Sequence, residues 1–260
     1  QMFCDDNQEI ADMIVQGYMI AEHPDVCLPV NVCYDGFYSS HLTSGVIIPD
    51  QDEVDRVLTP HAVNHKPILD PKYPLALDPM TPGDLLMHYR KNHLESMQKA
   101  QDVIDDVDKR FAEVFGRSYG GVIEEYRCED AEVVVVTMGG ITGTGKDAVD
   151  EARERGIRVG LIKIRFYRPF PAKRIAKALQ GKKAFCVVDR SVSFGWNRGS
   201  MYVETCAALS GSNEKQARFS AIGGLGGADV SFSDMVDIIV ELDKIKDQPG
   251  EHETRWLMQD

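Results

Sequence analysis

The stretch AEVVVVTMGGITGTGKDAVDEARERGIRVGLIKIRF, residues 131–166, decides the fold. Its apolar run at 131–138 predicts a buried strand, 147–156 predicts a helix, and 157–166 predicts a second strand. The glycine-rich GGITGTGKD between the first strand and the helix is expected to form a turn. Apolar strands that are separated by about ten helical residues indicate a parallel sheet with helices on both faces.

The same alternation continues downstream to residue 245. It predicts strands at 184–190 and 217–224 and helices at 172–181, 200–209 and 231–245, the last capped by Ser231 or Ser233. The expected fold class is therefore α/β, with four parallel strands and their helices between residues 125 and 245.

The pattern upstream of the sheet is different. Asn7 can cap a helix that runs to about Glu22, residues 27–35 predict a short buried strand, and Asp50 can cap a brief helix. The proline-dotted stretch 59–82 has no sustained period and is expected to be an extended linker. We place a domain boundary there.

One long helix is expected from Gly83 to about Phe115, where apolar residues recur every three or four positions. At 1.5 Å per residue it would be about 45–50 Å long, which exceeds an ordinary domain helix. We expect it to lie across a partner or domain surface. The alternative is an ordinary amphipathic helix on its own core.

The composition limits the possible partners. The chain carries 29 Lys and Arg against 41 Asp and Glu, a net charge of -12, which argues against nucleic acid and anionic membrane as partners. Six scattered cysteines without a CxxC pair predict reduced, buried thiols in a cytoplasmic protein, and no iron–sulfur cluster or zinc held by this chain alone. Because a helical pattern begins at once, without a signal peptide, we expect the chain to start partway through a domain.

GGITGTGKD also matches the phosphate-binding spacing G-x-x-x-x-G-K, from Gly140 to Lys146. The next position should carry a hydroxyl for magnesium, but Asp147 stands there and would repel phosphates. Asp189 is the only candidate for the second acidic residue of such a site. A P-loop NTPase is therefore an alternative rather than the leading hypothesis.

The other interpretation of the same stretch is a packing turn. Gly143 and Gly145 would then allow close packing, Thr142 or Thr144 would cap the helix, and Lys146 would be solvated. Weak anion binding at the start of the helix stays open in this interpretation.

Further loops follow the other predicted strands, at the edge of the sheet where ligands or partners usually bind. Arg165 and Arg168, in and beside FYRPFP at 166–171, could hold a partner's carboxylate, although a rigid corner is the simpler interpretation. DRSVSFGWNRGS at 189–200, with Trp196, is a candidate interface, and GGLGG after the last strand is a weaker one. Structural turns are the alternative for both.

The sequence contains no motif for metal binding or hydrolysis. His61 and His65 are four positions apart but lie in the proline-rich stretch without HExxH, and no GxSxG elbow occurs. We therefore assign no catalytic residue and no metal ligand.

Taken together, these segments resemble one family. In order they are LPVNVCYDGFYSSH, IPDQDEVDRVL, VVVVTMGGITGTGKDAVDEARERGIRVGLIKIRFYRPFP, VVDRSVSFGWNRGSMYVETCAALSG and AIGGLGGADVS. The series resembles the alpha subunit of 2-oxoacid:ferredoxin oxidoreductases of the pyruvate:ferredoxin oxidoreductase (pyruvate synthase) type. It covers nearly all of the chain except the C-terminal tail.

The resemblance implies a division of the chain. Residues 1–58 would be the C-terminal part of a thiamine-diphosphate pyrimidine-binding domain, 59–124 a linker with the long helix, 125–245 a transketolase C-terminal-like domain, and 246–260 a tail. It also implies oxidative decarboxylation of a 2-oxoacid, with pyruvate expected, the acyl group going to coenzyme A and the electrons to ferredoxin.

The implied cofactors belong to the assembled complex. Thiamine diphosphate and Mg would act there, [4Fe-4S] clusters would lie in partner subunits, and this chain alone would hold none. The partners would be beta-, gamma- and delta-type subunits, ferredoxin, and a chain or segment supplying the rest of the pyrimidine domain. The family's activating glutamate and its substrate-binding arginine and threonine are expected upstream of Gln1. The wording FGWNRGSMYVE keeps oxalate open as an alternative substrate.

The resemblance finally gives the glycine-rich turn a role. Thr142, Gly143, Thr144 and Gly145 are expected to start the first helix of the transketolase-like domain and to support packing between subunits, with an anion site as the weaker possibility. Two alternatives from other classes remain beside the enzyme subunit: a P-loop-like NTPase and a non-catalytic interaction module.

Overall fold

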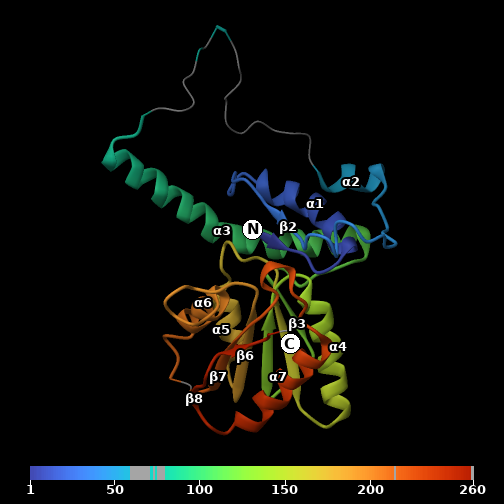
Figure 1. Ribbon diagram of the computed structural model, residues 1–260. Helices are drawn as coiled ribbons and strands as arrows, with labels where there is room; N and C mark the ends of the chain where they lie inside the picture. The colour runs from blue at the N-terminus through green and yellow to red at the C-terminus, as the bar shows by residue number, and fades with distance from the viewer. Residues whose placement is uncertain (59–70, 73, 75–79, 214, 259–260) are drawn as a thin grey trace.

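A seven-stranded sheet forms the centre of the computed structural model, which describes residues 1–58, 71–72, 74, 80–213 and 215–258 (Figure 1). The strand order is β3-β5-β4-β6-β7-β8, with β9 beside β7. The strands are β3 (Ile123–Tyr126), β4 (Val133–Thr137), β5 (Val159–Ile164), β6 (Ala184–Asp189), β7 (Ala217–Ile222), β8 (Gly250–Glu251) and β9 (Arg255–Trp256).

The predicted α/β class and the four parallel strands β4, β5, β6 and β7 are confirmed. The expectation of four strands is nevertheless too low. β3 pairs antiparallel with β5 and was missed because its sequence, IEEY, places two glutamates in succession and has no apolar run. β8 and β9 come from the predicted tail and are two residues long each, too short to leave a pattern.

Helices cover both faces of the sheet. α4 (Ile141–Glu154) and α7 (Phe232–Ile245) pack together on one face, and α5 (Ala172–Leu179) and α6 (Ser200–Ala208) on the other. Val133 and Val135 of β4 point into the first layer and Val134 and Val136 into the second, all fully buried. Burying each such side chain contributes roughly 1.5–3 kcal/mol relative to an exposed one. This explains why the apolar run predicted the strand.

The predicted capping of the last helix is confirmed. The Ser231 hydroxyl accepts the backbone N–H of Asp234, and the Asp234 carboxylate accepts the backbone N–H of Ser231. This reciprocal pair satisfies two N–H groups at the helix start.

The N-terminal part lies over the carboxyl ends of the parallel strands (Figure 1). It comprises β1 (Met2–Phe3), α1 (Asn7–Ala21), β2 (Val32–Cys33), α2 (Gln51–Val57) and α3 (Gly83–Phe115). Met2 and Met13 share one hydrophobic core with Phe185 and Val187 of β6, so this part is packed on the sheet and not held by a tether alone.

Two predictions in the N-terminal part are wrong in detail. The cap of α1 is Asp6, whose carboxylate accepts the N–H of Glu9, and not Asn7. The strand expected at 27–35 shrinks to β2, because Cys27 has a positive φ of 45° and Pro29 has no N–H to donate. Asp50 does precede α2, but its side chain makes no capping hydrogen bond.

The long helix is confirmed and has two unlike halves. Ala100, Ile104, Val107 and Phe111 are buried against the rest of the chain. Residues 83–95 are exposed, and Figure 1 shows this half of α3 projecting from the body. The expected linker at 59–82 and the two histidines 61 and 65 fall largely or wholly outside the described residues.

All six cysteines are free thiols, and only half of them are buried. Burial raises the pKa of the Cys128 thiol to about 12, so this thiol stays protonated near neutral pH. The expectation of buried thiols is wrong for Cys27, Cys33 and Cys206, which are partly exposed.

No helix in the described part of the chain combines the length and apolar character needed to cross a bilayer.

Candidate functional site

The glycine-rich stretch is mostly helix and not a turn. α4 begins at Ile141, six residues earlier than the predicted 147, and Gly140 stands at its N-cap. Only Gly139 keeps the positive φ, 71°, that a glycine turn requires. A P-loop needs open backbone before its lysine to surround phosphates, so a helix at these positions rules that geometry out.

Packing explains why a helix forms over residues with weak helix propensity. The Thr142 hydroxyl lies 3.1 Å from that of Thr137 on β4, inside the protein. A Cβ on Gly145 would lie 2.6 Å from Cδ1 of Leu161, so the predicted close packing is confirmed there. It is wrong for Gly143, where a Cβ would meet no atom within 4 Å.

The four candidate residues therefore separate into two pairs. Thr142 and Gly145 are buried, so neither can contact a partner or an anion directly. Gly143 is exposed and Thr144 lines a crevice, and for these two an interface role stays a prediction. The threonines do not cap the helix, because α4 begins before them.

Lys146 is not solvated as expected. Its ammonium lies 2.7 Å from Glu124 of β3 and 3.6 Å from Asp5, and 5.9 Å from the centre of the Tyr126 ring. These partners keep Lys146 on the β3 side of α4, away from the helix start. The lysine of the P-loop spacing is thus engaged in holding the fold together.

The crevice that Thr144 lines has a volume of about 490 Å³ and lies where the strand order changes direction. The chain leaves β4 towards β5 on one side and leaves β6 towards β7 on the other. Gly140 follows β4 and Arg190 follows β6, and both line the crevice. In open parallel sheets this position outside the carboxyl ends is the usual ligand site.

Asp35 reaches this crevice from the N-terminal part. Its carboxylate accepts the N–H of Gly140 at 3.1 Å and forms an ion pair with Arg190. Gly224 lies behind Arg190, since a Cβ there would be 2.9 Å from Nε. Thus DGFYSSH, GGITGTGKD, DRSVSFGWNRGS and GGLGG, distant in sequence, meet at one point.

Sequence reasoning did not single out Asp35 or Arg190. Both follow strand-like apolar runs, which is the available signal, because the carboxyl ends of parallel strands meet at one edge. Asp35 belongs to the N-terminal part, however, and local patterns do not reveal where that part docks.

Asp189, the residue before Arg190, binds the start of α6 and does not have the role of the second acidic residue in a nucleotide site. Its buried carboxylate accepts the N–H groups of Met201 and Tyr202, each at 3.0 Å. Burial raises the pKa of this carboxyl to about 6, although the two hydrogen bonds oppose the shift. A Cβ on Gly199 would overlap the carboxylate, which explains the glycine.

A cluster of buried charges joins α1 to the sheet beside this crevice. Lys163 and Arg165 are at most 1% exposed, as is Glu9. Glu9 lies 2.5 Å from the Lys163 ammonium and 3.1 Å from Nε of Arg165. Asp5 lies 3.2 Å from Lys163, and Asp108 of α3 lies 3.6 Å from Arg165. We call these five residues the buried charge cluster.

The two arginines expected to hold a partner's carboxylate bind carboxylates of this chain instead. Arg165 belongs to the buried charge cluster. Arg168 donates two hydrogen bonds to Glu204, at 2.9 and 2.7 Å, and stacks on the Tyr167 ring. The bond between Arg168 and Pro169 is cis, at the predicted corner.

The candidate interface loop after β6 exposes aromatic side chains. Trp196 is 72% exposed and Phe194 is 92% exposed. Hydrogen bonds from Trp256 and Thr254 to Asn197 hold the loop against the tail. Its role as an interface stays a prediction.

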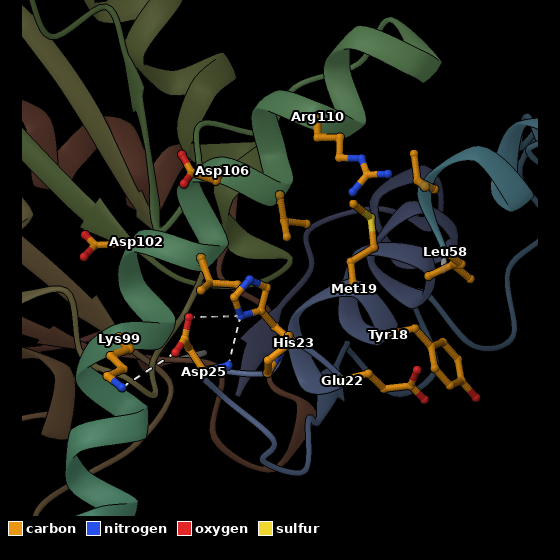
Figure 2. Close-up of a pocket in the computed structure, with 14 residues that line it drawn as sticks. Tyr18, Met19, Glu22, His23, Asp25, Leu58, Lys99, Asp102, Asp106 and Arg110 are labelled. Atoms are coloured by element: carbon orange, nitrogen blue, oxygen red, sulfur yellow. Dashed lines mark hydrogen bonds and ion pairs between the residues drawn. The ribbon is translucent and has the colours of Figure 1, made fainter. Parts of the chain in front are cut away.

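A second hollow, of about 700 Å³, lies between α1 and α3 (Figure 2). Figure 2 shows Lys99 of α3 reaching Asp25, which also faces His23. The distances are 3.7 and 3.9 Å. Lys99 and Asp25 are both 61% exposed and offset each other's charge, so this hollow is a weaker candidate for a site than the crevice at the sheet edge.

The crevice does not fit the diphosphate of thiamine diphosphate, the cofactor that the resemblance implies. Asp35 already occupies the start of α4, and Asp5, Asp6 and Asp229 line the same space, where they would repel phosphates. Among the described residues, no group of three or more His, Cys, Asp or Glu side chains could hold a metal ion. No reaction step is therefore assigned to this crevice.

Comparison with known proteins identifies the family. The model "Pyruvate flavodoxin/ferredoxin oxidoreductase, thiamine diP-bdg" matches residues 1–109, and "Pyruvate:ferredoxin oxidoreductase core domain II" matches 131–235. The alpha subunit of NADH-dependent phenylglyoxylate dehydrogenase from Aromatoleum evansii is 44% identical over 94% of this chain and 60% of its own length. Pyruvate synthase subunit PorA from Methanocaldococcus jannaschii is 39% identical over 99% of this chain and 64% of its own.

A solved 2-oxoglutarate:ferredoxin oxidoreductase from Magnetococcus marinus superposes with a TM-score of 0.46 at 14% identity, over 75% of this chain and 30% of that one. That likeness is too distant to bear on the site. The two family models together span most of the chain, in the expected order. The chain belongs to the family of 2-oxoacid:ferredoxin oxidoreductase alpha subunits.

Proposed function

We propose that this chain is part of a thiamine-diphosphate-dependent enzyme that oxidatively decarboxylates a 2-oxoacid and passes the electrons to ferredoxin. The observation that carries the proposal is the match of both family models along one chain, with relatives that are themselves enzyme subunits. The chain spans 60–64% of the length of these two relatives. Because both relatives are named as subunits, we propose that the activity belongs to a larger assembly.

We propose that this chain forms part of the interface between subunits and supplies no catalytic residue. Its polar groups at the sheet edge are engaged with one another, as the pair of Asp35 and Arg190 illustrates. Thiamine diphosphate, when bound, supplies the carbanion chemistry of decarboxylation. We propose that partner chains hold it with Mg²⁺ and hold the [4Fe-4S] clusters, and that the complex works in the cytoplasm.

The proposed boundaries are those of the sequence analysis: 1–58, 59–124, 125–245 and 246–260. Partner subunits of beta, gamma and delta type, and the chain or segment completing the pyrimidine domain, would meet this chain at its sheet edge. The exposed Phe194 and Trp196 support that placement, because aromatic side chains are enriched at protein interfaces.

Pyruvate is the proposed substrate, with coenzyme A as the acyl acceptor. The relative with 44% identity is named for phenylglyoxylate, an aromatic 2-oxoacid, and for NADH. This favours an aromatic 2-oxoacid as the second candidate and NAD as a second electron acceptor. Oxalate is the third candidate substrate.

The test is purification of the native assembly through a tag on this chain, followed by assays with pyruvate, phenylglyoxylate, 2-oxoglutarate and oxalate. We expect reduction of ferredoxin that depends on one 2-oxoacid and disappears when thiamine diphosphate is removed. An assembly that contains cluster-bearing subunits but reduces no acceptor with any 2-oxoacid would favour the interaction-module alternative. Purification of this chain alone would contradict the proposal.

A further inference from the structure

The start of α4 is a natural place for an anion. Backbone N–H groups point out of the helix there, and the helix dipole adds a partial positive charge. It also lies at the switch point between β4 and β6, where parallel sheets usually bind ligands. In this chain a carboxylate that belongs to the protein occupies the place.

We propose that Asp35 is a positioning residue that acts as a built-in anion. By binding the start of α4 and Arg190, it fixes residues 36–48 as one wall of the crevice at the sheet edge. This goes beyond the proposed function, because it assigns the ligand position of the sheet to an internal contact.

The packing around Asp35 supports this assignment. A Cβ on Gly140 would lie 2.0 Å from Oδ2 of Asp35, so the helix start has no side chain where the carboxylate enters. Gly224 gives Arg190 the same kind of space. The Asp35 and Arg190 side chains are 21% and 29% exposed, so water screens their mutual attraction only in part.

The other contacts of this wall show why Asp35 is decisive. Ser44 accepts a hydrogen bond from Asn7 at 2.7 Å, and Ile47 exchanges two hydrogen bonds with Gln8, at 2.7 and 3.0 Å. Both of these partners belong to α1. Among the hydrogen bonds and ion pairs of residues 35–48 in the described chain, those of Asp35 alone reach the sheet domain.

The direction of the wall therefore depends on one carboxylate. Without the Asp35 carboxylate, residues 36–48 would remain bonded to α1 but would no longer be held in a fixed position relative to α4 and Arg190. Tyr38, Ser39 and Leu42, which line the crevice, would lose their fixed position.

The experiment compares three variants of the chain in its native assembly: Asp35→Ala, Asp35→Asn and, as a matched control, Asp229→Asn. Asp229 lines the same crevice, and in the described part of the chain no hydrogen bond or ion pair joins its side chain to Gly140 or Arg190. Amide hydrogen exchange is measured for peptides covering 36–48 and for peptides of β4. Each protein is measured in about 0.1 M sodium formate and in sodium chloride of equal ionic strength, because salt itself screens ion pairs.

We expect Asp35→Ala to exchange about tenfold faster or more at 36–48, because a charge-assisted contact is lost, with β4 unchanged. Formate should restore part of the protection in Asp35→Ala, since it can occupy the vacated place, and chloride should restore less. Asp35→Asn, whose amide fills the place, should exchange faster without rescue by formate. In the wild type and in Asp229→Asn, exchange at 36–48 should be the same in formate as in chloride.

Unchanged exchange at 36–48 in both Asp35 variants would overturn the proposal. So would equal effects of formate and chloride on Asp35→Ala, which would mean that the place has no affinity for a carboxylate. If Asp35→Ala does not fold, the nearly isosteric Asp35→Asn decides: protection equal to that of Asp229→Asn contradicts the positioning role.

Discussion

Among the contacts that hold the N-terminal part to the sheet, two ionic contacts have opposite character. In the buried charge cluster, Glu9 meets Lys163 and Arg165 where no water reaches. At the crevice, Asp35 meets Gly140 and Arg190 at the rim, where both side chains are partly exposed. Both contacts pair a carboxylate of the N-terminal part with a cation of the sheet domain.

Burial makes their consequences different. A buried charge that loses its partner retains the full cost of its removal from water, whereas water can solvate a charge at the rim. The buried charge cluster is therefore expected to decide whether the two parts stay together. The contact of Asp35 is expected to decide how the crevice wall is oriented.

The largest predicted effect comes from breaking the buried contact. Glu9→Gln keeps the shape but leaves Lys163 and Arg165 without their shared carboxylate, so the free energy of unfolding should fall by about 3–5 kcal/mol. Chemical denaturation at pH 7 measures it. Glu95→Gln, on the exposed half of α3, is the control and should change stability by less than about 0.5 kcal/mol. A loss below about 1 kcal/mol for Glu9→Gln would mean that apolar packing holds the parts together.

The next effect is a pH dependence of stability that comes from Asp189, the buried carboxyl beside Arg190. The pKa of Asp189 is about 6 in the folded protein, against an ordinary value of 3.8, because the carboxyl is buried. Its neutral form is thus favoured by folding. The stability from this group is fully present below pH about 4 and is lost as pH rises to about 6, by roughly 2–3 kcal/mol.

Asp189→Asn cannot titrate, so that fall should be missing from its curve of stability against pH. Thermal unfolding of both proteins between pH 4 and 7 tests this. Parallel curves for the two proteins would show that Asp189 titrates near its ordinary value.

The sequence was sufficient for the four central strands of the sheet, β4 to β7, but not for its edge strands or its connections. The valines of β4 predicted a buried strand because every one of them faces a helix layer. The start of α4 could not be predicted, since Gly and Thr have weak helix propensity and contacts with Thr137 and Leu161 decide there.

The candidate site was predictable to a similar extent. Because the carboxyl ends of parallel strands meet at one edge of the sheet, the sequence alone predicts that Gly140 and Arg190 lie near each other. Asp35 is 105 positions from Gly140 and 155 from Arg190, and no local pattern links them. Long-range ion pairs of this kind depend on how two parts dock, which is a property of the whole fold.

A smaller effect should come from two glycines at the start of α4, the N-cap Gly140 and Gly143 in the first turn. Gly140→Ala would place a Cβ 2.0 Å from Oδ2 of Asp35 and should cost about 1–2 kcal/mol. Gly143→Ala meets no atom within 4 Å and should stabilise the helix by up to about 1 kcal/mol. Combining Gly140→Ala with Asp35→Ala should remove most of the first cost, because the two changes share one contact. Additive effects would show that Gly140 is constrained by something other than Asp35.

The smallest effect concerns Lys146, whose partners are Asp5 of the buried charge cluster and Glu124 of β3. Its side chain is about a quarter exposed, so Lys146→Ala should lower stability by no more than about 1 kcal/mol, more than Lys91→Ala on the exposed half of α3. Calorimetric titration should detect no magnesium–ATP binding by the wild type or the variant, because α4 occupies the space of a phosphate loop. Tight binding that Lys146→Ala abolishes would mean that the helix start opens around a nucleotide. Asp35 would then have to leave Gly140, and the contrast between a buried tie and a positioning contact would no longer hold.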